Sequence, residues 1–308
     1  MSDIRIAIVG FGKIAHDQHV PAIATTDGVT LVAVADPNPV TASVPHFRSL
    51  EELLREGPEI DAVALATPPQ IRRAQAALAL AAQKHVFLEK PPGRAISEIL
   101  PLIAAAREAR RSLFASWHAR FAPAVEPARR LLAERKLLGA TITWKEDVRK
   151  WHPGQEWIFA PGGFGVFDPG INALSILTRI LPRPPFVTAS TLEIPANRAA
   201  PIAVELELSD GAGLPIRASF DFRERNREIW EIHIETDKGP VSLSAGGARL
   251  LAGAEILVDA KKDSYPLLYR RFVELVRENR SDVDLSPLQL VADAFLLGRA
   301  RQAESFDF

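Results

Sequence analysis

The sequence has 308 residues, a length that predicts two domains or one large one. Apolar residues make up 47% and charged residues 24%, a balance that is typical of a globular protein with a real core and excludes wholesale disorder. Lysine and arginine (37) nearly equal aspartate and glutamate (38), so the net charge of −1 argues against nucleic acid or an anionic membrane as a partner.

Three further features narrow the class of protein. The lack of cysteine excludes disulfides, thiolate metal sites and cysteine nucleophiles. No apolar run reaches the ~18 residues that a transmembrane helix needs, so we expect no membrane span. The first residues, MSDIRIAIVG, carry charges within the first apolar stretch and no small-residue cleavage site, which is typical of a cytoplasmic protein and not of a signal peptide.

Residues 1–120 alternate apolar runs of strand length with segments of helical length. The runs are almost continuously apolar, as strands covered on both faces should be. Alternation with short connections predicts an α/β domain with a doubly wound parallel sheet, the Rossmann arrangement. The expected strands are 4–9, 30–35, 62–66, 85–88 and 113–117, and the expected helices are 14–25 (kinked or split at Pro21), 50–55, 72–83 and 96–110.

The first predicted strand runs directly into residues 10–15, GFGKIA, a G-x-G-x-x-A loop that opens a helix. In such a loop Gly10 permits the tight turn, and Gly12 lets the backbone approach a pyrophosphate. The helix start then points its free N–H groups at the anion. We therefore expect Gly10, Gly12, Lys13 and Ile14 to bind a dinucleotide; the alternative is an ordinary tight turn.

An acidic residue, Asp36, ends the second predicted strand at about the ~20-residue spacing expected for a ligand of the adenosine ribose. A carboxylate there accepts hydrogen bonds from the ribose 2′-hydroxyl and repels a 2′-phosphate. No arginine or lysine follows in residues 37–39 to bind that phosphate. The sequence therefore predicts NAD as the cofactor, with NADP left open as a second one.

Polar residues end two more of the predicted strands, at the sheet edge where open α/β sheets bind ligands. A lysine there is unusual, because burial disfavours its charged form, and such a lysine can donate or accept a proton. The alternative is that Lys90 reaches solvent with Glu89 as its ion-pair partner. The residues expected near the cofactor at this edge are Thr67, Pro68, Gln70, Glu89, Lys90 and His118.

After Trp117 the pattern changes, and we place the domain boundary near Arg120. Period-2 alternation over 203–208, 216–222 and 230–235 predicts a sheet with one face that is open to solvent or to a partner. Residues 121–308 are thus predicted to form an α+β domain with a mostly antiparallel sheet. Its other expected elements are a strand over 141–148 and helices over 121–136, 169–180, 266–278 and 287–302.

Asp168 and Asn172 stand four residues apart at the start of one of these helices, so they share a helix face. Beside apolar neighbours, this arrangement suits a clamp for a substrate hydroxyl. Asp168 also directly precedes Pro169, which is typical of an N-cap with proline at the first helical position. The spacing leaves both interpretations open.

Residues 144–157 carry three of the five tryptophans, interspersed with charged and polar groups. Aromatic faces beside carboxylates suit a sugar ring, although the tryptophans could equally pack in a core or an interface. The residues expected to bind the sugar are Glu146, Asp147, Trp151 and His152. The histidines at 16, 19, 118 and 152 show no metal-ligand spacing, so no metal is predicted.

On the GFGKIA loop, the Glu89-Lys90-Pro91 turn and the Asp-Pro-Gly-Ile-Asn start of the helix after residue 167, the chain resembles the glucose–fructose oxidoreductase/inositol dehydrogenase (Gfo/Idh/MocA) family. Three longer blocks, 144–155, 162–176 and 281–299, resemble the aldose 1-dehydrogenases of that family. The resemblance implies oxidation of the anomeric carbon of D-galactose or L-arabinose to a lactone, with hydride transfer to NAD(P). It also implies a homodimer.

The resemblance further implies that Lys90, Asp168 and Asn172 are catalytic. The broader family usually has histidine where this chain has Asn172, so the proton is expected to pass through Lys90 or Asp168. Two rival functions remain at this stage: another sugar or polyol dehydrogenase of the family, and a non-catalytic nicotinamide-binding sensor.

Overall fold

The computed structural model describes residues 2–261 and 263–308, which fold into two compact units. The first unit comprises the described part of Met1–His118 together with Asp263–Asp284, and the second comprises the described part of Ala119–Lys262 together with Leu285–Phe308. The first break lies beside the expected boundary at Arg120. The return over Asp263–Asp284 was not predicted: the apolar face of α8 (Tyr265–Arg277) is buried within the first unit.

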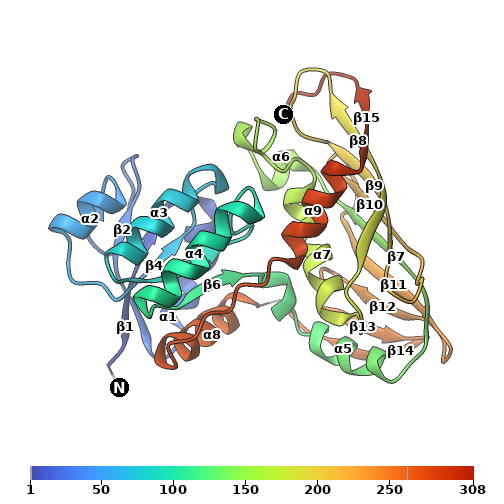
Figure 1. The fold of residues 1–308 in the computed structure, drawn as a ribbon, viewed down its shortest axis with the longest axis horizontal. Coiled ribbons are helices and arrows are strands. Elements are labelled where there is room, and N and C mark those ends of the chain that lie inside the picture. The colour runs from blue at the N-terminus through green and yellow to red at the C-terminus, as the bar shows by residue number, and fades with distance from the viewer. Residues whose placement is uncertain (1, 262) are drawn as a thin grey trace. The chain divides into compact units, whose positions relative to one another are not determined.

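The first unit is built on a six-stranded sheet, and its pairings are all parallel (Figure 1). Its strand order, β3-β2-β1-β4-β5-β6, is the Rossmann order, which confirms the predicted doubly wound sheet. The strands are β1 (Ile4–Val9), β2 (Val29–Ala35), β3 (His46–Phe47), β4 (Ala62–Leu65), β5 (His85–Glu89) and β6 (Leu113–Ser116).

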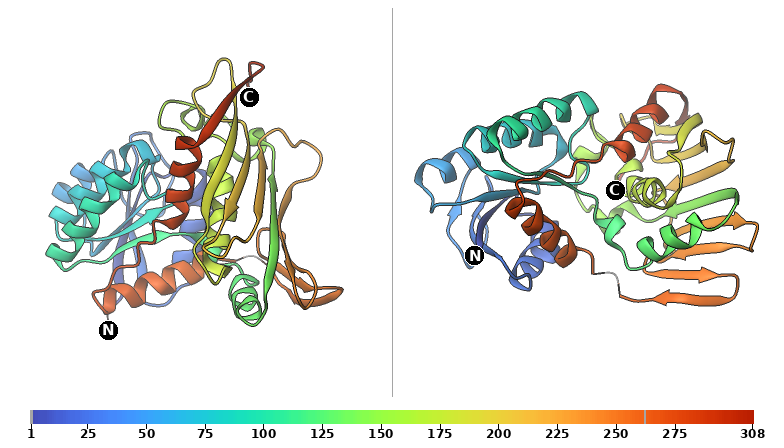
Figure 2. Two further views of the ribbon diagram at one scale, coloured as in Figure 1. Left: turned by 45° about the vertical axis from the view of Figure 1, so that its right-hand side comes forward. Right: turned by 60° about the horizontal axis from the view of Figure 1, so that its bottom comes forward.

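Helices cover both faces of this sheet. In Figure 2, α3 (Pro69–Ala81) and α4 (Ile96–Ala109) lie on one face, and α1 (Val20–Ala24) and α8 lie on the other. A π-helical segment, Ala15–His19, precedes α1, so the predicted first helix is divided near Pro21 as expected. The remaining helix, α2 (Leu50–Glu56), begins at Ser49, whose hydroxyl accepts a hydrogen bond from the amide of Glu52.

The second unit is built on a nine-stranded sheet of order β14-β13-β12-β11-β7-β10-β9-β8-β15. Only the pairs β7·β10 and β8·β15 are parallel among the described pairings, which confirms the predicted mostly antiparallel sheet. The strands are β7 (Leu137–Lys145), β8 (Phe186–Pro195), β9 (Ala203–Ser209), β10 (Ile216–Asp221), β11 (Ile229–Thr236), β12 (Val241–Ser244), β13 (Arg249–Ala252), β14 (Glu255–Asp259) and β15 (Gly298–Ala303).

Three helices, α5 (Val125–Ala133), α7 (Phe167–Ile180) and α9 (Ser286–Leu296), lie on one face of this sheet (Figure 1). The strands alternate accordingly. In β9, Leu206 and Leu208 are buried under the helices, whereas Glu205 and Glu207 are exposed on the opposite face. The period-2 pattern in the sequence therefore located the open face of the sheet correctly.

Several predicted boundaries in the second unit were wrong. The helix expected over 121–136 is the shorter α5, and the helix expected over 287–302 ends at Leu296, after which β15 pairs with β8. The strand expected over 141–148 ends at Lys145, because the Asp147 carboxylate accepts the amide of Arg149 and caps the short helix α6 (Val148–Trp151). In each case an end was set by capping or by strand pairing that hydrophobic periodicity does not report.

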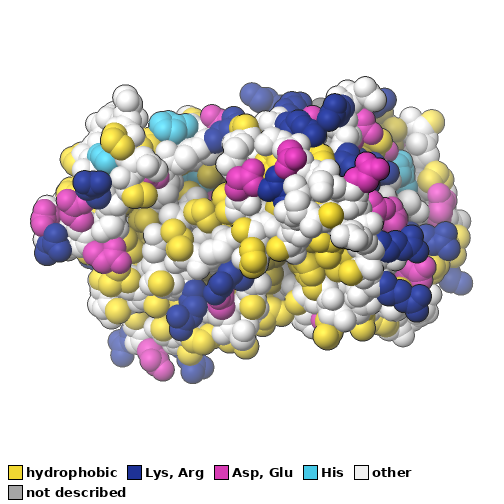
Figure 3. All heavy atoms as spheres, turned by 90° about the horizontal axis from the view of Figure 1, so that it is seen from above, with side chains coloured by type: hydrophobic (Ala, Val, Ile, Leu, Met, Phe, Trp, Pro, Cys, Tyr) yellow, Lys and Arg dark blue, Asp and Glu magenta, His cyan; other side chains and the backbone are white. Residues whose placement is uncertain are grey.

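The surface is electrostatically mixed. On the face shown in Figure 3, lysine and arginine side chains are interspersed with aspartate and glutamate, in keeping with the net charge of −1. Of the helices that the structure describes, none has the length and apolar character required to cross a membrane.

Candidate active site

The glycine loop of the first unit has the backbone that a dinucleotide needs. Gly10 has a φ of +87°, and a Cβ there would lie 2.8 Å from the backbone nitrogen of Thr67, so only glycine fits. A Cβ on Gly12 would meet no atom within 4 Å, and the residue is exposed. The loop therefore combines a tight turn against β4 with open space beside Gly12, which is the form of a pyrophosphate cradle.

The helix that follows the loop begins immediately after Gly12. The carbonyl of Gly12 accepts the amides of Ala15 (3.0 Å) and His16 (3.2 Å). The amides of Lys13 and Ile14 thus belong to the first turn, where N–H groups have no partner within the helix and favour an anion. These residues fit a dinucleotide.

Asp36 connects the glycine loop to the end of β2. One of its carboxylate oxygens accepts the backbone amide of Phe11 (2.8 Å), and the other accepts the amide of Asn38 (2.9 Å). The carboxylate is thereby held in place beside the loop, as a ribose ligand must be.

At the next strand end, the helix α3 begins at Pro69, three residues before the start that the sequence predicted. Pro69 fits this position because the first helical residue needs no donor. Pro68 is therefore the N-cap residue and Gln70 lies in the first turn, and both are half-buried. The Thr67 hydroxyl donates to the Gln75 side chain (2.6 Å), which positions it within the unit.

Arg72, a residue that the sequence analysis did not single out, organises the segment 89–92, here called the Lys90 turn. The Arg72 side chain is 3% exposed. Its guanidinium donates to the backbone carbonyls of Thr67, Glu89 and Pro91. One buried cation thus holds the backbone before and after Lys90, which is itself half-buried.

Glu89 is also buried, 3% exposed, and both of its carboxylate oxygens contact protein groups. Its Oε2 accepts the backbone amide of Lys90 (2.7 Å), and its Oε1 accepts the Tyr265 hydroxyl (2.7 Å). The Nε2 atom of His19 lies 3.3 Å from the same Oε1, an ion-pair distance without hydrogen-bond alignment. The other ring nitrogen of His19 is 2.6 Å from the Tyr269 hydroxyl. We call Glu89, His19, Tyr265 and Tyr269 the Glu89 network.

Electrostatics keep Glu89 ionised inside this network. Burial raises the pKa of its carboxyl, but the contact and charge of His19, the charge of His118 and the hydrogen bond from Tyr265 outweigh burial and lower the pKa to about 2. Burial and the neighbouring carboxylate raise the pKa of Tyr265 well above its usual value, so its hydroxyl remains a donor. The His118 ring stacks on Tyr265 with centroids 5.7 Å apart, which places this predicted cofactor residue at the border of the network.

In the second unit, Asp168 is not the N-cap that one interpretation predicted. The helix α7 begins at Phe167 after Val166, so Asp168 lies inside its first turn and is 3% exposed. The tight approach before the helix requires glycine, because Gly165 has a φ of +53° and a Cβ there would lie 2.1 Å from the Pro201 carbonyl oxygen. The loop geometry, and not a capping side chain, therefore starts this helix.

The structure brings Asp168 and His152 together. The His152 Nε2 lies 3.4 Å from the Asp168 Oδ2, and its Nδ1 lies 3.3 Å from the Gln155 side chain. Asn172 follows one helical turn after Asp168 and is half-buried. A carboxylate beside an imidazole forms a pair that can accept and hold a proton, and this pairing was not predicted from the sequence.

The other predicted sugar residues have different environments. Glu146 is buried and accepts the indole N–H of Trp230 (2.9 Å), a residue that the sequence analysis missed. Asp147 caps α6, as described above, so its carboxylate already has a structural role. Trp151 is exposed and donates to Glu228 (2.9 Å). Hydrophobic periodicity offers no signal for the role of Trp230, because that role comes from its contact with Glu146, which directly follows β7.

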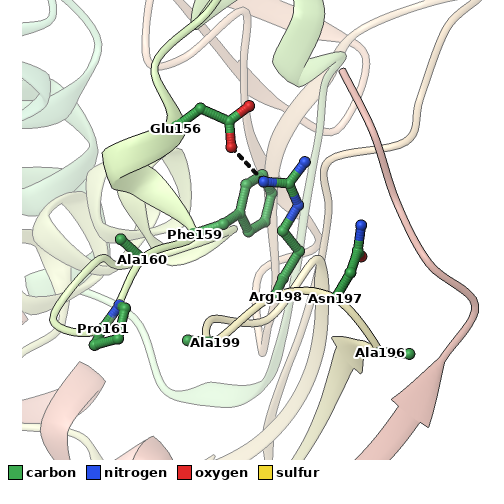
Figure 4. Close-up of a pocket in the computed structure, with 8 residues that line it drawn as sticks. All are labelled: Glu156, Phe159, Ala160, Pro161, Ala196, Asn197, Arg198 and Ala199. Atoms are coloured by element: carbon green, nitrogen blue, oxygen red, sulfur yellow. Dashed lines mark hydrogen bonds and ion pairs between the residues drawn. The ribbon is translucent and has the colours of Figure 1, made fainter.

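The last residues of the described chain pack on this region. The Phe306 ring lies under the Arg149 guanidinium at 4.6 Å, and Arg149 also donates to the Asp307 carbonyl (3.1 Å). Figure 4 shows the adjoining hollow, in which Arg198 pairs with Glu156 beside the Phe159 ring. The segment 146–159 is therefore held at two places by residues that are distant in the sequence.

Among the described residues, no three histidine, aspartate or glutamate side chains are grouped so that they could hold a metal ion. A Rossmann sheet with a glycine-loop cradle and an acid at the β2 end, in a chain that also carries a buried aspartate beside a half-buried histidine, defines an oxidoreductase that uses a nicotinamide dinucleotide.

Comparison with known proteins gives the family. Residues 4–116 match the oxidoreductase family with an NAD-binding Rossmann fold, Gfo/Idh/MocA. A galactose 1-dehydrogenase from Pseudomonas fluorescens is 46% identical over 306 residues, 99% of each chain. The chain belongs to the Gfo/Idh/MocA family, as its motifs indicated.

Two solved structures extend the comparison. The crystal structure of a D-galactose-1-dehydrogenase from Rhizobium etli is 50% identical, with a TM-score of 0.95, and the match covers 100% of this chain and 99% of that one. A 3-ketoreductase from Actinomadura kijaniata, crystallised with NADP and TDP-benzene, is 18% identical with a TM-score of 0.87 over 98% of this chain and 100% of that one. The second structure shares the fold alone.

Proposed function

We propose that this protein is an aldose 1-dehydrogenase that oxidises the anomeric carbon of D-galactose, and also of L-arabinose, to the aldonolactone. The observation that carries the proposal is the similarity to two galactose 1-dehydrogenases over essentially the whole chain. A shared Rossmann unit alone indicates only the cofactor class, but here the similarity includes the second unit, which carries the predicted sugar residues.

The reaction separates a hydride from a proton. Nicotinamide dinucleotide, when bound, accepts the hydride from C1 of the sugar. The protein must take the proton from the C1 hydroxyl, and we assign this task to Asp168, with His152 beside it to share the charge. Lys90 is proposed to bind the same oxygen and stabilise the charge that develops on it, and Asn172 to orient the ring.

The cofactor is proposed to be NAD in preference to NADP. The Asp36 carboxylate, held by the amides of Phe11 and Asn38, suits the 2′-hydroxyl of NAD and opposes a 2′-phosphate. Gly12, Lys13 and Ile14 are proposed to hold the pyrophosphate, and Pro68, Gln70 and His118 to border the nicotinamide half.

We also propose a cytoplasmic homodimer. The nine-stranded sheet has one face without helices, on which Glu205 and Glu207 are exposed. A second copy of the chain is the proposed partner on that face. Light scattering of the purified protein would report a mass near twice that of the chain, and a monomeric mass at micromolar concentration would contradict this part of the proposal.

The test of the function is direct. The protein is mixed with NAD or NADP and a panel of D-galactose, L-arabinose, 6-deoxygalactose, D-glucose and inositol, and the absorbance of reduced nicotinamide is followed. We expect turnover with the first three sugars and NAD. Glucose differs only at C4, and a pocket built around an axial 4-hydroxyl can reject it by up to about 10⁴–10⁵-fold. Turnover with inositol alone, or no turnover with any sugar of the panel, would refute the proposal.

A further inference from the structure

The Glu89 network has the features of a device that holds Lys90, although none of its members was expected to touch the substrate. His19, Tyr265 and Tyr269 come from two segments that are distant in the sequence, Ala15–His19 and α8. All three side chains are almost fully buried. A group of buried polar side chains is costly to assemble, so its geometry requires an explanation beyond packing.

The contacts of Arg72 and of the Glu89 network converge on the backbone around Lys90. Glu89 accepts the backbone amide of Lys90, and that carboxylate is in turn held by Tyr265. Arg72 donates to the carbonyl of Glu89 and to that of Pro91. The peptide group that precedes Lys90, and the carbonyl of Pro91 after it, therefore have buried, charged partners, so the Lys90 side chain starts from a backbone that cannot readily shift.

We propose that Arg72, Tyr265 and His19 are positioning residues for Lys90. Glu89 transmits the hold of Tyr265 and His19 to the Lys90 amide, and in this role it is a positioning residue and not a ligand of the cofactor. This inference rests on the proposed role of Lys90 in the reaction. It changes the expectation from the sequence, in which Glu89 was grouped with the cofactor-binding residues.

The groups that face Glu89 also predict a dependence on pH. They are His19 from the π-helical segment, Tyr265 and Tyr269 from α8, His118 after β6, and the Arg72 guanidinium at the backbone. The Tyr265 hydroxyl lowers the pKa of Glu89, so its loss raises that pKa. A protonated Glu89 has one fewer acceptor site for the Lys90 amide, so the pH at which this hold on Lys90 weakens should be higher when the Tyr265 hydroxyl is absent.

The experiment compares Tyr265→Phe with Ser112→Ala. The Ser112 hydroxyl is buried and donates to the Leu275 carbonyl of the same helix α8 (2.9 Å), so its loss loosens α8 without touching Glu89. We expect Tyr265→Phe to lower kcat by about tenfold and to leave the KM for NAD within about twofold. Ser112→Ala should have the same kcat and the same KM for NAD as the wild type. Tyr269→Phe, one step further from Glu89, should show a smaller loss in the same direction.

A second readout does not depend on turnover. Reductive methylation of lysines, followed by peptide mass spectrometry, measures the reactivity of Lys90 against the exposed Lys13 as internal reference. We expect Tyr265→Phe to change the Lys90 rate by at least about twofold, and Ser112→Ala to leave it unchanged. Equal Lys90 rates and equal kcat in Tyr265→Phe and wild type would overturn the inference, as would equal losses in both variants. Inactive wild-type protein would refute the proposed function instead, and the labelling comparison would still decide this inference.

Discussion

The Lys90 turn of the first unit and the segment 146–159 of the second carry predicted site residues, but they are held in different ways. The Lys90 turn is held by buried charged and polar groups, Arg72 and the Glu89 network. The segment 146–159 combines buried and surface contacts: Glu146 is buried and accepts the indole N–H of Trp230, whereas Lys150 pairs with Glu228 near the surface and Arg149 stacks on Phe306.

Buried and surface contacts differ in how strongly their loss destabilises the folded unit. An unsatisfied buried charge costs far more than a lost surface ion pair, because water compensates the exposed partner. We therefore infer that the Lys90 turn, on the predicted cofactor side, has a backbone whose position scarcely changes. The segment 146–159, which carries the predicted sugar residues, has surface contacts in addition, and these can change without unfolding the unit.

The largest expected effect is that of Lys90→Ala. Loss of a positioned acid–base or charge-stabilising group should lower kcat by about 10²–10⁴-fold. The KM for NAD should change little, because the glycine loop is untouched. Lys84→Ala is the matched control, since Lys84 precedes the amino end of β5 and Lys90 follows its carboxyl end. Steady-state kinetics with galactose check both, and a Lys90→Ala enzyme with near wild-type kcat would remove Lys90 from the reaction.

Asp168→Asn tests the second unit in the same way. Asparagine keeps the shape but not the charge beside His152, so kcat should fall by about 10²-fold, while the melting temperature barely moves because Asp168 is not a helix cap. Asp210→Asn should give the reverse pattern. The Asp210 carboxylate is buried and accepts the amides of Ala212 and Leu214, so its replacement should lower the melting temperature and spare kcat. Retained activity in Asp168→Asn would contradict its role as the proton acceptor.

The cofactor preference is expected to respond more moderately. Replacing Asp36 by serine and Pro37 by arginine removes the repulsion of a 2′-phosphate and supplies a cation for it. The ratio of kcat/KM for NADP over NAD should rise by about tenfold or more, at 1.4 kcal/mol per tenfold. A wild-type enzyme that already prefers NADP severalfold would contradict the predicted role of Asp36.

A smaller effect is expected at the contact between the chain end and the segment 146–159. Phe306→Ala removes the ring under Arg149, a contact of the kind worth about 0.5–1 kcal/mol at an exposed site. The KM for galactose should rise by a few fold and the KM for NAD should stay constant. Phe186→Ala, which removes an exposed ring at the start of β8, serves as the control. Equal KM values for galactose in the two variants would show that this anchor does not act on the sugar.

The last prediction concerns stability at acid pH and not activity. Burial, with a contribution from Arg111, lowers the pKa of His85 from 6.5 to about 4. The unfolded chain then binds the proton first, so stability should fall as pH drops from about 6.5 to 4. Glu89, whose pKa is about 2 in the folded protein and 4.5 in the reference state, should lose its contribution from pH 4.5 downward. In His85→Gln, the melting temperature should depend less on pH between about 6.5 and 4 than it does in the wild type, while its dependence at lower pH should be the same. An unchanged dependence in the upper range would contradict the assignment to His85.

The sequence predicted the features that depend on local patterns. Apolar runs located five of the six strands of the first sheet but not the short β3, alternation located the open face of the second, and the GFGKIA loop located the cradle at Gly10 and Gly12. It did not predict the return of α8 to the first unit, nor β15. Hydrophobic periodicity reports that a face is buried, but it contains no information on the partner that buries it.

The same distinction holds for the site. Residue type and spacing made Lys90, Asp168 and Asn172 candidates, because chemistry and helix geometry are local properties of the chain, and the resemblance to the family implied their catalytic roles, which stay predictions. Only the tertiary structure paired Asp168 with His152 and surrounded Glu89 with His19 and Tyr265. Such pairings join residues far apart in the sequence, and the free energy that selects them comes from burying charges together, a term that exists only once the chain has folded.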